Sequence, residues 1–242
     1  MIVFRKITTK KNILFFTVHK AASMFIYKVC HDLCKAAGLS YYSINHNKNS
    51  RYYFDTESGG LDDIGIWGAR TGCFAPLRYY FMVPEELNAR IILHLRDPRD
   101  VLVSLYYSEA FSHSVIKGVF DLGRKERNEI VEKGIDTFVL TRAVEFNNKY
   151  AEYRCLLSRP NVVFVKYEDL VCNLSAWLGA VAKNFDIVDI KCIDKIWGPM
   201  IFDYMYKYLR SIKWCRCYQK RKGEEEKAIT SWQLPVAYRN NL

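Results

Sequence analysis

Short, almost entirely apolar runs recur along the chain. The clearest cover Ile13 to Val18, Ala89 to Leu95 and Asn161 to Lys166. Runs of this length and composition are typical of strands buried on both faces of a parallel sheet. Two shorter candidate strands, Tyr41 to Ile44 and Ile64 to Ala69, lie in a stretch with a less regular pattern.

Helical periodicity follows these runs. Apolar residues from Ile26 to Ala37 recur at helical spacing, and Gly38 is suited to end that helix. Asp97 and Pro98 form a helix start, as N-cap and first helical residue. Strands that alternate with helices indicate an α/β domain with a mainly parallel sheet.

The second half of the chain continues the alternation. The polar, glycine-punctuated stretch from Glu109 to Gly134 predicts a mobile surface segment. An apolar stripe from Val139 to Leu157 predicts a long helix that ends before Pro160, and Glu168 begins another. No repeat or convincing linker divides the chain, so we expect a single domain over residues 1–242.

Charge and length narrow the classes of function. The formal net charge is +10, which suits nucleic acid, an acidic membrane surface or a polyanionic small ligand. No clustered basic stripe or nucleic-acid motif supports the first of these. No apolar run is long enough to cross a bilayer, and the start shows no secretory signal. We therefore expect a cytoplasmic protein.

The chain contains eight cysteines. Without an export signal they should be reduced. Cys30 and Cys34 lie on the apolar stripe of a predicted helix, and Cys215 and Cys217 have no second pair nearby. This pattern favours buried, unpaired thiols over a metal site.

The turn from His19 to Phe25 is the first candidate for chemistry. It lies between a buried strand and a helix, where free backbone N–H groups and the positive end of the helix dipole suit a phosphate. Lys20 adds a positive charge and Ser23 a hydroxyl. An ordinary strand-to-helix turn is the simpler interpretation of this loop alone. It does not match the Walker A pattern.

The second candidate runs from Arg96 to Ser104. Arg96 ends a strand, and Ser104 lies in the next helix, eight positions on (96 to 104). A guanidinium at the carboxyl edge of a sheet and a hydroxyl on the adjoining helix can converge on one phosphate. Pairing of Arg96 with other surface charges is the alternative.

The segment His94 to Tyr107 resembles the 3′-phosphate motif of the sulfotransferase family, which has an Arg and a Ser eight positions apart around Asp-Pro-Arg-Asp. The loop His19 to Phe25 is similar to the family's 5′-phosphosulfate loop, and Val165 to Leu170 to a third element that ends in Tyr-Glu-Asp-Leu. The three stand in the family's order. The resemblance implies a three-layer sandwich with a central, mainly parallel sheet flanked by helices, in the P-loop NTPase-like sulfotransferase fold.

The resemblance also implies a reaction. A sulfonate group would move from 3′-phosphoadenosine 5′-phosphosulfate (PAPS) to a hydroxyl or amine of an acceptor, without a metal. Lys20 would stabilise the departing 5′-phosphate, Arg96 and Ser104 would bind the 3′-phosphate, and Tyr167 would contact the adenine side. The full set of residues expected to bind the nucleotide is Lys20, Ala21, Ala22, Ser23, Met24, Phe25, Arg96, Ser104, Tyr167, Arg221, Lys222 and Gly223.

Three features depart from the family pattern. Ala22 stands where a Gly usually lets the backbone approach the phosphate, and Met24 where a hydroxyl usually contacts it. The region Ile66 to Cys73, which matches the segment that supplies a catalytic His in relatives, has no His. The family's C-terminal Arg-Lys-Gly is matched from Arg221 to Gly223, without the Gly-Asp-Trp that follows it in relatives. A solvated basic tail is the alternative for that segment.

A hydroxyl acceptor also needs a general base. Of the five histidines, His46 is the preferred candidate, because it follows the second predicted strand at the carboxyl edge of the sheet. A carboxylate from Glu57, Asp62 or Asp63 is the alternative, since a Glu serves in some carbohydrate-modifying relatives.

Three other functions stay open at this point. They are a nucleotide-dependent kinase of the same architecture, a non-catalytic protein that binds the nucleotide, and a nucleic-acid-binding module. The short chain favours a small-molecule acceptor over a carbohydrate, because it leaves little room for a further binding domain. The sequence does not determine the oligomeric state.

Overall fold

The computed structural model describes residues 11–43, 71–85, 87–112 and 124–187. By its internal contacts the chain divides into two compact units, Met1–Ile190 and Lys191–Leu242. All described residues belong to the first unit. The predicted single domain over 1–242 extends past these residues and stays a prediction.

The first unit is built on a parallel sheet with the strand order β2-β3-β1-β4-β5. Its strands are β1 (Asn12–Thr17), β2 (Ser40–Ser43), β3 (Gly72–Leu77), β4 (Ala89–Leu95) and β5 (Val162–Lys166). The three long apolar runs of the sequence form β1, β4 and β5, and the candidate strand at Tyr41 forms β2. Every residue of β1 and β3 is buried, as expected of central strands in a parallel sheet.

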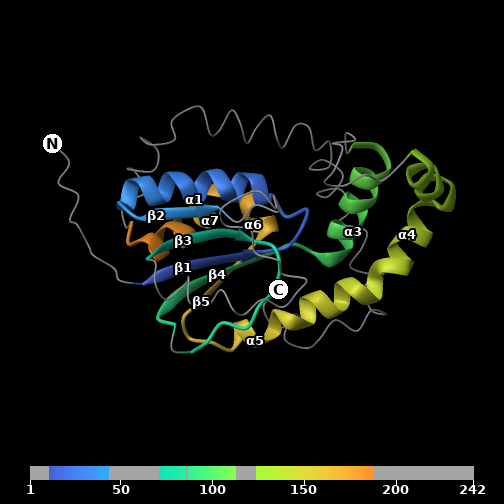
Figure 1. Cartoon of the computed structure of the whole chain (residues 1–242). Coiled ribbons are helices and arrows are strands. Elements are labelled where there is room, and N and C mark those ends of the chain that lie inside the picture. Colours follow the sequence, from blue (N-terminus) through green and yellow to red (C-terminus); the bar gives the residue numbers. More distant parts are fainter. Residues whose placement is uncertain (1–10, 44–70, 86, 113–123, 188–242) are drawn as a thin grey trace. The chain divides into compact units, whose positions relative to one another are not determined.

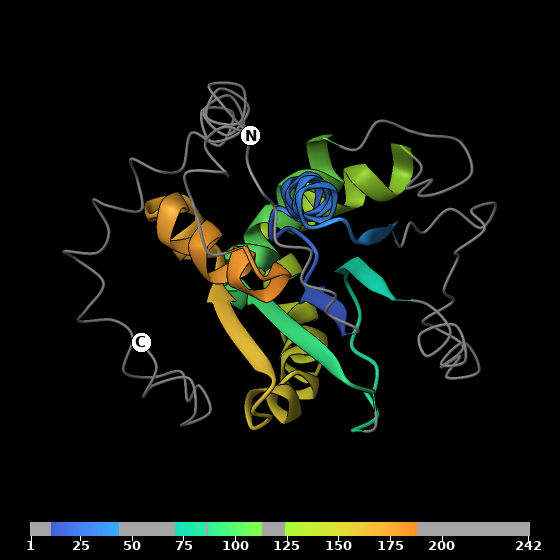
Figure 2. The same ribbon diagram turned by 90° about the vertical axis from the view of Figure 1, so that its left-hand side faces the viewer.

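Helices cover both faces of this sheet (Figure 1). The helical segments are α1 (Ser23–Ala37), α3 (Pro98–Tyr107), η2 (Ser108–Ser112), α4 (Arg124–Glu152), α5 (Arg154–Leu157), α6 (Tyr167–Cys172), α7 (Leu174–Ala182) and η3 (Lys183–Phe185). Figures 1 and 2 show α1 with α6 and α7 on one face, and the C-terminal part of α4 with α5 on the other. The predicted three-layer α/β architecture is confirmed.

Strand β3 was not predicted, and its sequence explains why. The strand contains Pro76, which cannot donate to a sheet ladder, and its pairing with β1 shifts register between Leu14 and Phe16. It begins at Gly72, where an added Cβ would lie 2.4 Å from the carbonyl oxygen of Ser40. Only glycine therefore permits this close contact between β2 and β3. The candidate strand Ile64 to Ala69 lies outside the described residues.

The stretch predicted as a surface segment, Glu109 to Gly134, is helical where the structure describes it, and most side chains of residues 125–133 are exposed as expected of a surface. Ser108–Ser112 form a π-helix that continues α3, and residues 124–134 are part of α4. The chain bends at Gly134, which has φ 75° and ψ 170°. Tyr106, Ala110 and Phe138 form a small buried cluster there, so apolar packing accounts for the order that the polar composition hid.

Cysteines and charges follow the sequence predictions in part. Cys30, Cys34 and Cys73 are free and buried, but Cys155 and Cys172 are free and exposed, so the expectation of burial is wrong for these two. No cluster of metal-binding side chains occurs within the described ranges. None of the helices described in the structure is long and apolar enough to span a membrane.

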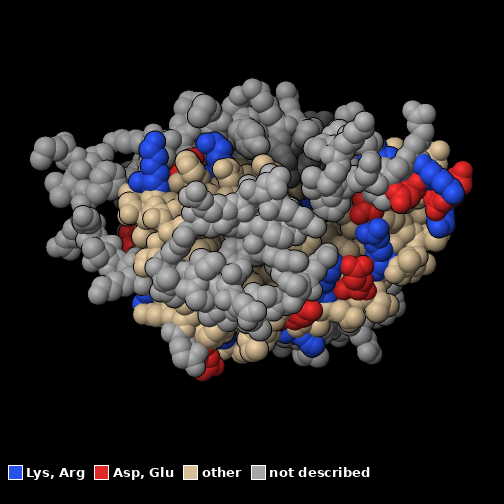
Figure 3. Space-filling model, in the orientation of Figure 1, with Lys and Arg blue, Asp and Glu red and all other residues tan. Residues whose placement is uncertain are grey.

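Described basic and acidic side chains are interspersed around α3 and α4 (Figure 3). Ion pairs in this region join Lys133 with Glu129, Arg142 with Glu109, and Lys149 with Glu145. On the described part of this face, basic side chains therefore alternate with acidic ones and do not form one basic stripe.

Candidate functional site

Strands β1 and β4 bring the two sequence motifs to one edge of the sheet. The strands are adjacent and parallel, and Thr17 is in register with His94. The loop that contains Lys20 and the segment that begins at Arg96 therefore leave the sheet side by side. This is also where the chain order reverses, since β2 and β3 lie on one side of β1 and β4 and β5 on the other. Open α/β sheets bind ligands at such a reversal.

The loop after β1 has an unusual backbone. Lys20 has φ 64° and Ala22 has φ 58°, both in the left-handed region. A non-glycine residue in this region costs about 1–2 kcal/mol. Ala22 thus adopts the backbone conformation that a Gly would favour. The departure from the family pattern therefore adds strain to the loop, but the backbone still makes the turn that a Gly would allow.

The loop leads directly into α1, with Ala22 as its N-cap. The N–H groups of Phe25 and Ile26 bond to the carbonyl of Ala22, whereas the N–H groups of Ser23 and Met24 precede the first intrahelical bonds. The side chain of Phe25 is buried, as is that of Ala21 in the loop, whereas Met24 is 68% exposed. Phe25 and Ala21 can therefore offer a ligand only their backbone.

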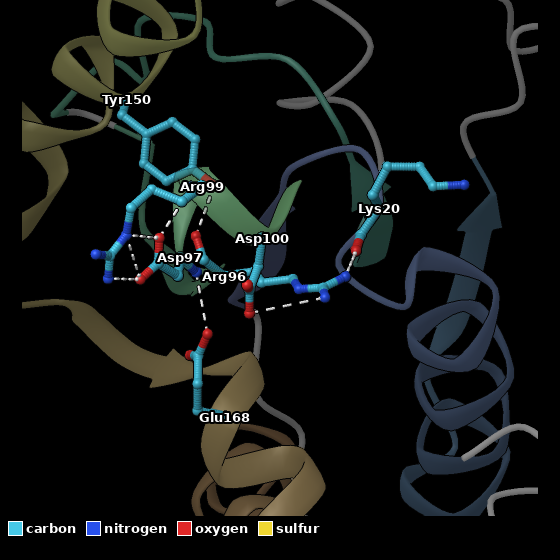
Figure 4. Close-up of polar contacts among 7 residues, drawn as sticks. All are labelled: Lys20, Arg96, Asp97, Arg99, Asp100, Tyr150 and Glu168. Carbon is cyan, nitrogen blue, oxygen red and sulfur yellow. Dashed lines mark hydrogen bonds and ion pairs between the residues drawn. The ribbon is translucent and has the colours of Figure 1, made fainter. Parts of the chain in front are cut away.

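Arg96 joins this loop to the end of β4 (Figure 4). Its Nη1 donates a hydrogen bond of 2.8 Å to the carbonyl oxygen of Lys20. Its Nη2 lies 3.8 Å from a carboxylate oxygen of Asp100, and its guanidinium lies over the ring of Tyr167 at 4.4 Å. The side chain is only 9% exposed. Its buried Nε–H has no hydrogen-bond partner within the part of the chain that the structure describes.

Two further side chains bind the peptide group that joins Arg96 to Asp97, and sequence reasoning missed both roles. The hydroxyl of Tyr150, from α4, donates to the carbonyl of Arg96 at 2.6 Å. The carboxylate of Glu168 accepts from the N–H of Asp97 at 3.0 Å. Figure 4 shows them approaching the segment from opposite sides. Tyr150 lies on the predicted helical stripe, but its hydroxyl gave no signal of its partner.

Ser104 lies on α3, one helical turn beyond Asp100 and thus on the face that meets Arg96. Its side chain is half-buried. Five predicted site residues are not placed with this group, because His46, Arg221, Lys222, Gly223 and the alternative base Glu57 lie outside the described residues. Asp62 and Asp63 lie outside them too.

The family model of the sulfotransferase domain matches residues 77–226. This match covers more than half of the 242 residues. The chain belongs to the sulfotransferase family. The matched region contains Arg96, Ser104 and Tyr167, whereas the loop around Lys20 precedes it.

One of the solved structures compared supports the fold. The mouse sulfotransferase SULT7A1, complexed with PAP, is 14% identical with a TM-score of 0.51 over 78% of this chain. Retinol dehydratase in a complex with retinol and PAP is 15% identical, with a TM-score of 0.40 over 73% of the chain. The chain spans 63% and 60% of the lengths of these proteins, which is less than two thirds. A comparison with curated proteins finds no match.

The electrostatics of this sulfotransferase-family site centre on Lys20. Burial and the neighbouring guanidinium of Arg96 lower the pKa of the Lys20 ammonium, and the carboxylate of Glu109 acts in the opposite direction. Glu109 is held by Arg142 through two hydrogen bonds of 3.1 and 3.0 Å. Sequence reasoning missed Glu109, because it placed the residue in a mobile segment.

His94 cannot act as the base in this sulfotransferase-family chain. It is fully buried among aromatic rings, including those of Phe15 and Trp177, and its Nδ1 lies 3.3 Å from the hydroxyl oxygen of Thr17. Burial lowers its pKa to about 3. His94 is therefore a packing residue of β4.

Proposed function

We propose that the chain is a PAPS-dependent sulfotransferase. The observation that carries the proposal is the contact between Arg96 and the Lys20 loop, at the point where the sheet order reverses. The guanidinium of Arg96, the backbone of the Lys20 loop and the N-terminus of α1 meet there, which is a combination that suits a ligand with phosphates at two positions. Since the chain belongs to the sulfotransferase family, we propose that this ligand is PAPS, which has phosphates at its 3′ and 5′ positions.

The residues present fit such a nucleotide. The Nε–H of the buried Arg96 guanidinium has no acceptor among the residues that the structure describes, and a phosphate oxygen is an excellent one. The N–H groups of Ser23 and Met24 stand at the positive end of α1, beside Lys20. PAP, the desulfonated nucleotide 3′-phosphoadenosine 5′-phosphate, is bound in the mouse sulfotransferase of the same fold. We propose PAPS as the co-substrate here.

Bound PAPS would supply a sulfonate activated by its link to the 5′-phosphate. When the bond between sulfur and the bridging oxygen breaks, that oxygen stays on the 5′-phosphate, and Lys20 would stabilise its negative charge. The backbone from Ala21 to Phe25 would hold the 5′-phosphate, and Arg96 with Ser104 the 3′-phosphate. Tyr167 is proposed as an adenine-side contact; in the structure its ring packs against the guanidinium of Arg96 and the ring of His94. Arg221, Lys222 and Gly223 complete the proposed set.

The proposal for the acceptor follows from the chemistry of sulfonate transfer. We propose a hydroxyl or amine of a small molecule, with a carbohydrate as the alternative, and no nucleic acid. His46 is the proposed general base, with Glu57, Asp62 or Asp63 in its place if the acceptor is a sugar. We also propose a cytoplasmic location and metal-independent transfer.

Transfer of ³⁵S-labelled sulfonate tests the function. The full chain is incubated with labelled PAPS and panels of phenols, sterols, sugars and amines, with EDTA present. We expect a labelled product and an equal amount of PAP for at least one class of acceptor. Lys20→Ala should slow transfer by about 100-fold or more.

Two results would point elsewhere. Tight PAP binding without transfer to any class would favour the non-catalytic nucleotide-binding protein. Magnesium-dependent phosphoryl transfer from ATP, with no PAP binding, would favour the kinase.

A further inference from the structure

Arg96 divides its donors between two directions. A guanidinium has five N–H donors arranged in a rigid fork. Nη1 is committed to the carbonyl of Lys20 at 2.8 Å. The other edge, formed by Nε and Nη2, has no hydrogen bond at Nε within the described residues and only a distant ion pair, 3.8 Å, from Nη2 to Asp100. One edge holds the loop while the other stays able to bind an anion.

The held carbonyl belongs to a residue in an unfavourable conformation. Lys20 has φ 64°, and Ala22 two positions later has φ 58°. Such conformations persist where the surroundings hold them in place. Figure 4 shows the carbonyl of Lys20 directed at Arg96 and its ammonium directed away. The bond from Nη1 therefore restrains the peptide plane that directly follows the Cα of Lys20, and with it the path of the loop.

Arg96 itself is held on several sides. Tyr167 lies under the guanidinium at 4.4 Å, and Tyr150 holds the Arg96 carbonyl at 2.6 Å. Because the anchor is rigid and buried, its hydrogen bond can transmit a restraint to the loop. A flexible, exposed side chain could not do this.

We infer that Arg96 is a positioning residue for Lys20 and its loop, in addition to its proposed contact with the 3′-phosphate. The inference rests on the proposed function, because it concerns the two ends of the same nucleotide. It makes the two phosphate sites energetically coupled. Loss of the Arg96 fork should then weaken ligands that have no 3′-phosphate at all.

Calorimetric titration of the full chain with two probes tests this coupling. The probes are PAP and adenosine 5′-phosphosulfate, which lacks the 3′-phosphate. Arg96→Lys keeps the positive charge but loses the fork. We expect it to weaken both probes by about tenfold or more. Ser104→Ala is the matched control, which should weaken PAP by about tenfold and leave adenosine 5′-phosphosulfate within about twofold of wild type.

The outcomes separate the inference from the function. If Arg96→Lys weakens PAP alone, Arg96 is only a 3′-phosphate ligand and the coupling is wrong, while the function stands. If the wild type binds neither probe, the proposed function itself fails.

A second measurement needs no variant. Hydrogen–deuterium exchange of the wild type is followed with adenosine 3′-phosphate, which can fill only the 3′-phosphate site. Coupling predicts that amides 20–24 exchange at least about twofold more slowly when this ligand is bound. Unchanged exchange of these amides at a saturating concentration would overturn the inference.

Discussion

The carboxylate of Glu168 accepts a hydrogen bond from the backbone N–H of Asp97 at 3.0 Å, across 71 positions of sequence. Each residue belongs to a segment that the sequence alone marks as similar to a sulfotransferase motif. The bond joins the N-terminus of α6 to the N-terminus of α3, so these two motifs form one structural unit. Burial raises the pKa of the Glu168 carboxyl, although the hydrogen bond from Asp97 opposes this.

Removal of the Glu168 acceptor should destabilise the fold. Glu168→Ala leaves a partly buried N–H without its acceptor, which costs about 1–3 kcal/mol. Glu168→Gln keeps a carbonyl oxygen and avoids the burial of a charge, so its free energy of unfolding should stay within about 1 kcal/mol of wild type. Urea denaturation measures both, with the exposed neighbour Asp169→Ala as control. Equal losses for Ala and Gln would contradict the role given to the hydrogen bond.

Lys20 should affect transfer far more than nucleotide binding. Lys20→Ala should lower the transfer rate by about 100-fold and the affinity for PAP by less than about tenfold. The reason is that the Lys20 ammonium stabilises most strongly the charge that develops on the leaving phosphate in the transition state. Its pKa lies below 10.5, so the wild-type rate should fall on the alkaline side at a lower pH than an ordinary lysine gives. Lys20→Arg stays charged and should lack this fall. Identical alkaline profiles in the two proteins would count against Lys20.

His94 should make stability depend on pH. Its pKa in the folded chain is about 3, against 6.5 for an unperturbed His. Below pH 6.5 the unfolded chain therefore binds a proton that the folded chain does not, and the free energy of unfolding decreases as the pH falls. Between pH 7 and pH 5 the wild type should lose roughly 2 kcal/mol more than His94→Gln. Parallel losses in urea denaturation at the two pH values would show that His94 titrates normally.

Glycine should be tolerated at Ala22. Ala22→Gly relieves the left-handed strain of about 1–2 kcal/mol. Against this, glycine gives the unfolded chain more conformational entropy to lose on folding, which costs about 0.5–1 kcal/mol. The free energy of unfolding should stay unchanged or rise. The same substitution at Ala143, inside α4, should cost about 0.5–1 kcal/mol. A loss at position 22 as large as that at position 143 would mean that the loop is not strained.

The sequence predicted those parts of the fold in which local pattern and tertiary role agree. The runs that became β1 and β4 are apolar because both faces of each strand are covered, whereas the apolar run of β5 is only partly buried. Asp97 with Pro98 starts α3 as predicted. Strand β3 was hidden by Gly72 and Pro76, which serve a close contact and a register shift. Those features depend on neighbouring strands and leave no local pattern.

The site shows the same division. The proximity of Lys20 and Arg96 follows from two motifs at the ends of adjacent strands, and could be expected. Two other hydrogen bonds end on backbone atoms. Arg96 donates to the carbonyl of Lys20, and the hydroxyl of Tyr150 donates to the carbonyl of Arg96. Residue types at a given spacing do not encode such contacts, because every residue has the same carbonyl.

Equilibrium binding of PAP, beside 5′-AMP and ATP with magnesium, tests the central claim most directly. Isothermal titration calorimetry of the full wild-type chain gives the three affinities. The account predicts micromolar PAP binding, with 5′-AMP and ATP about 100-fold weaker, because only PAP fills both phosphate positions. Tighter binding of ATP than of PAP, or no binding of PAP, would contradict it.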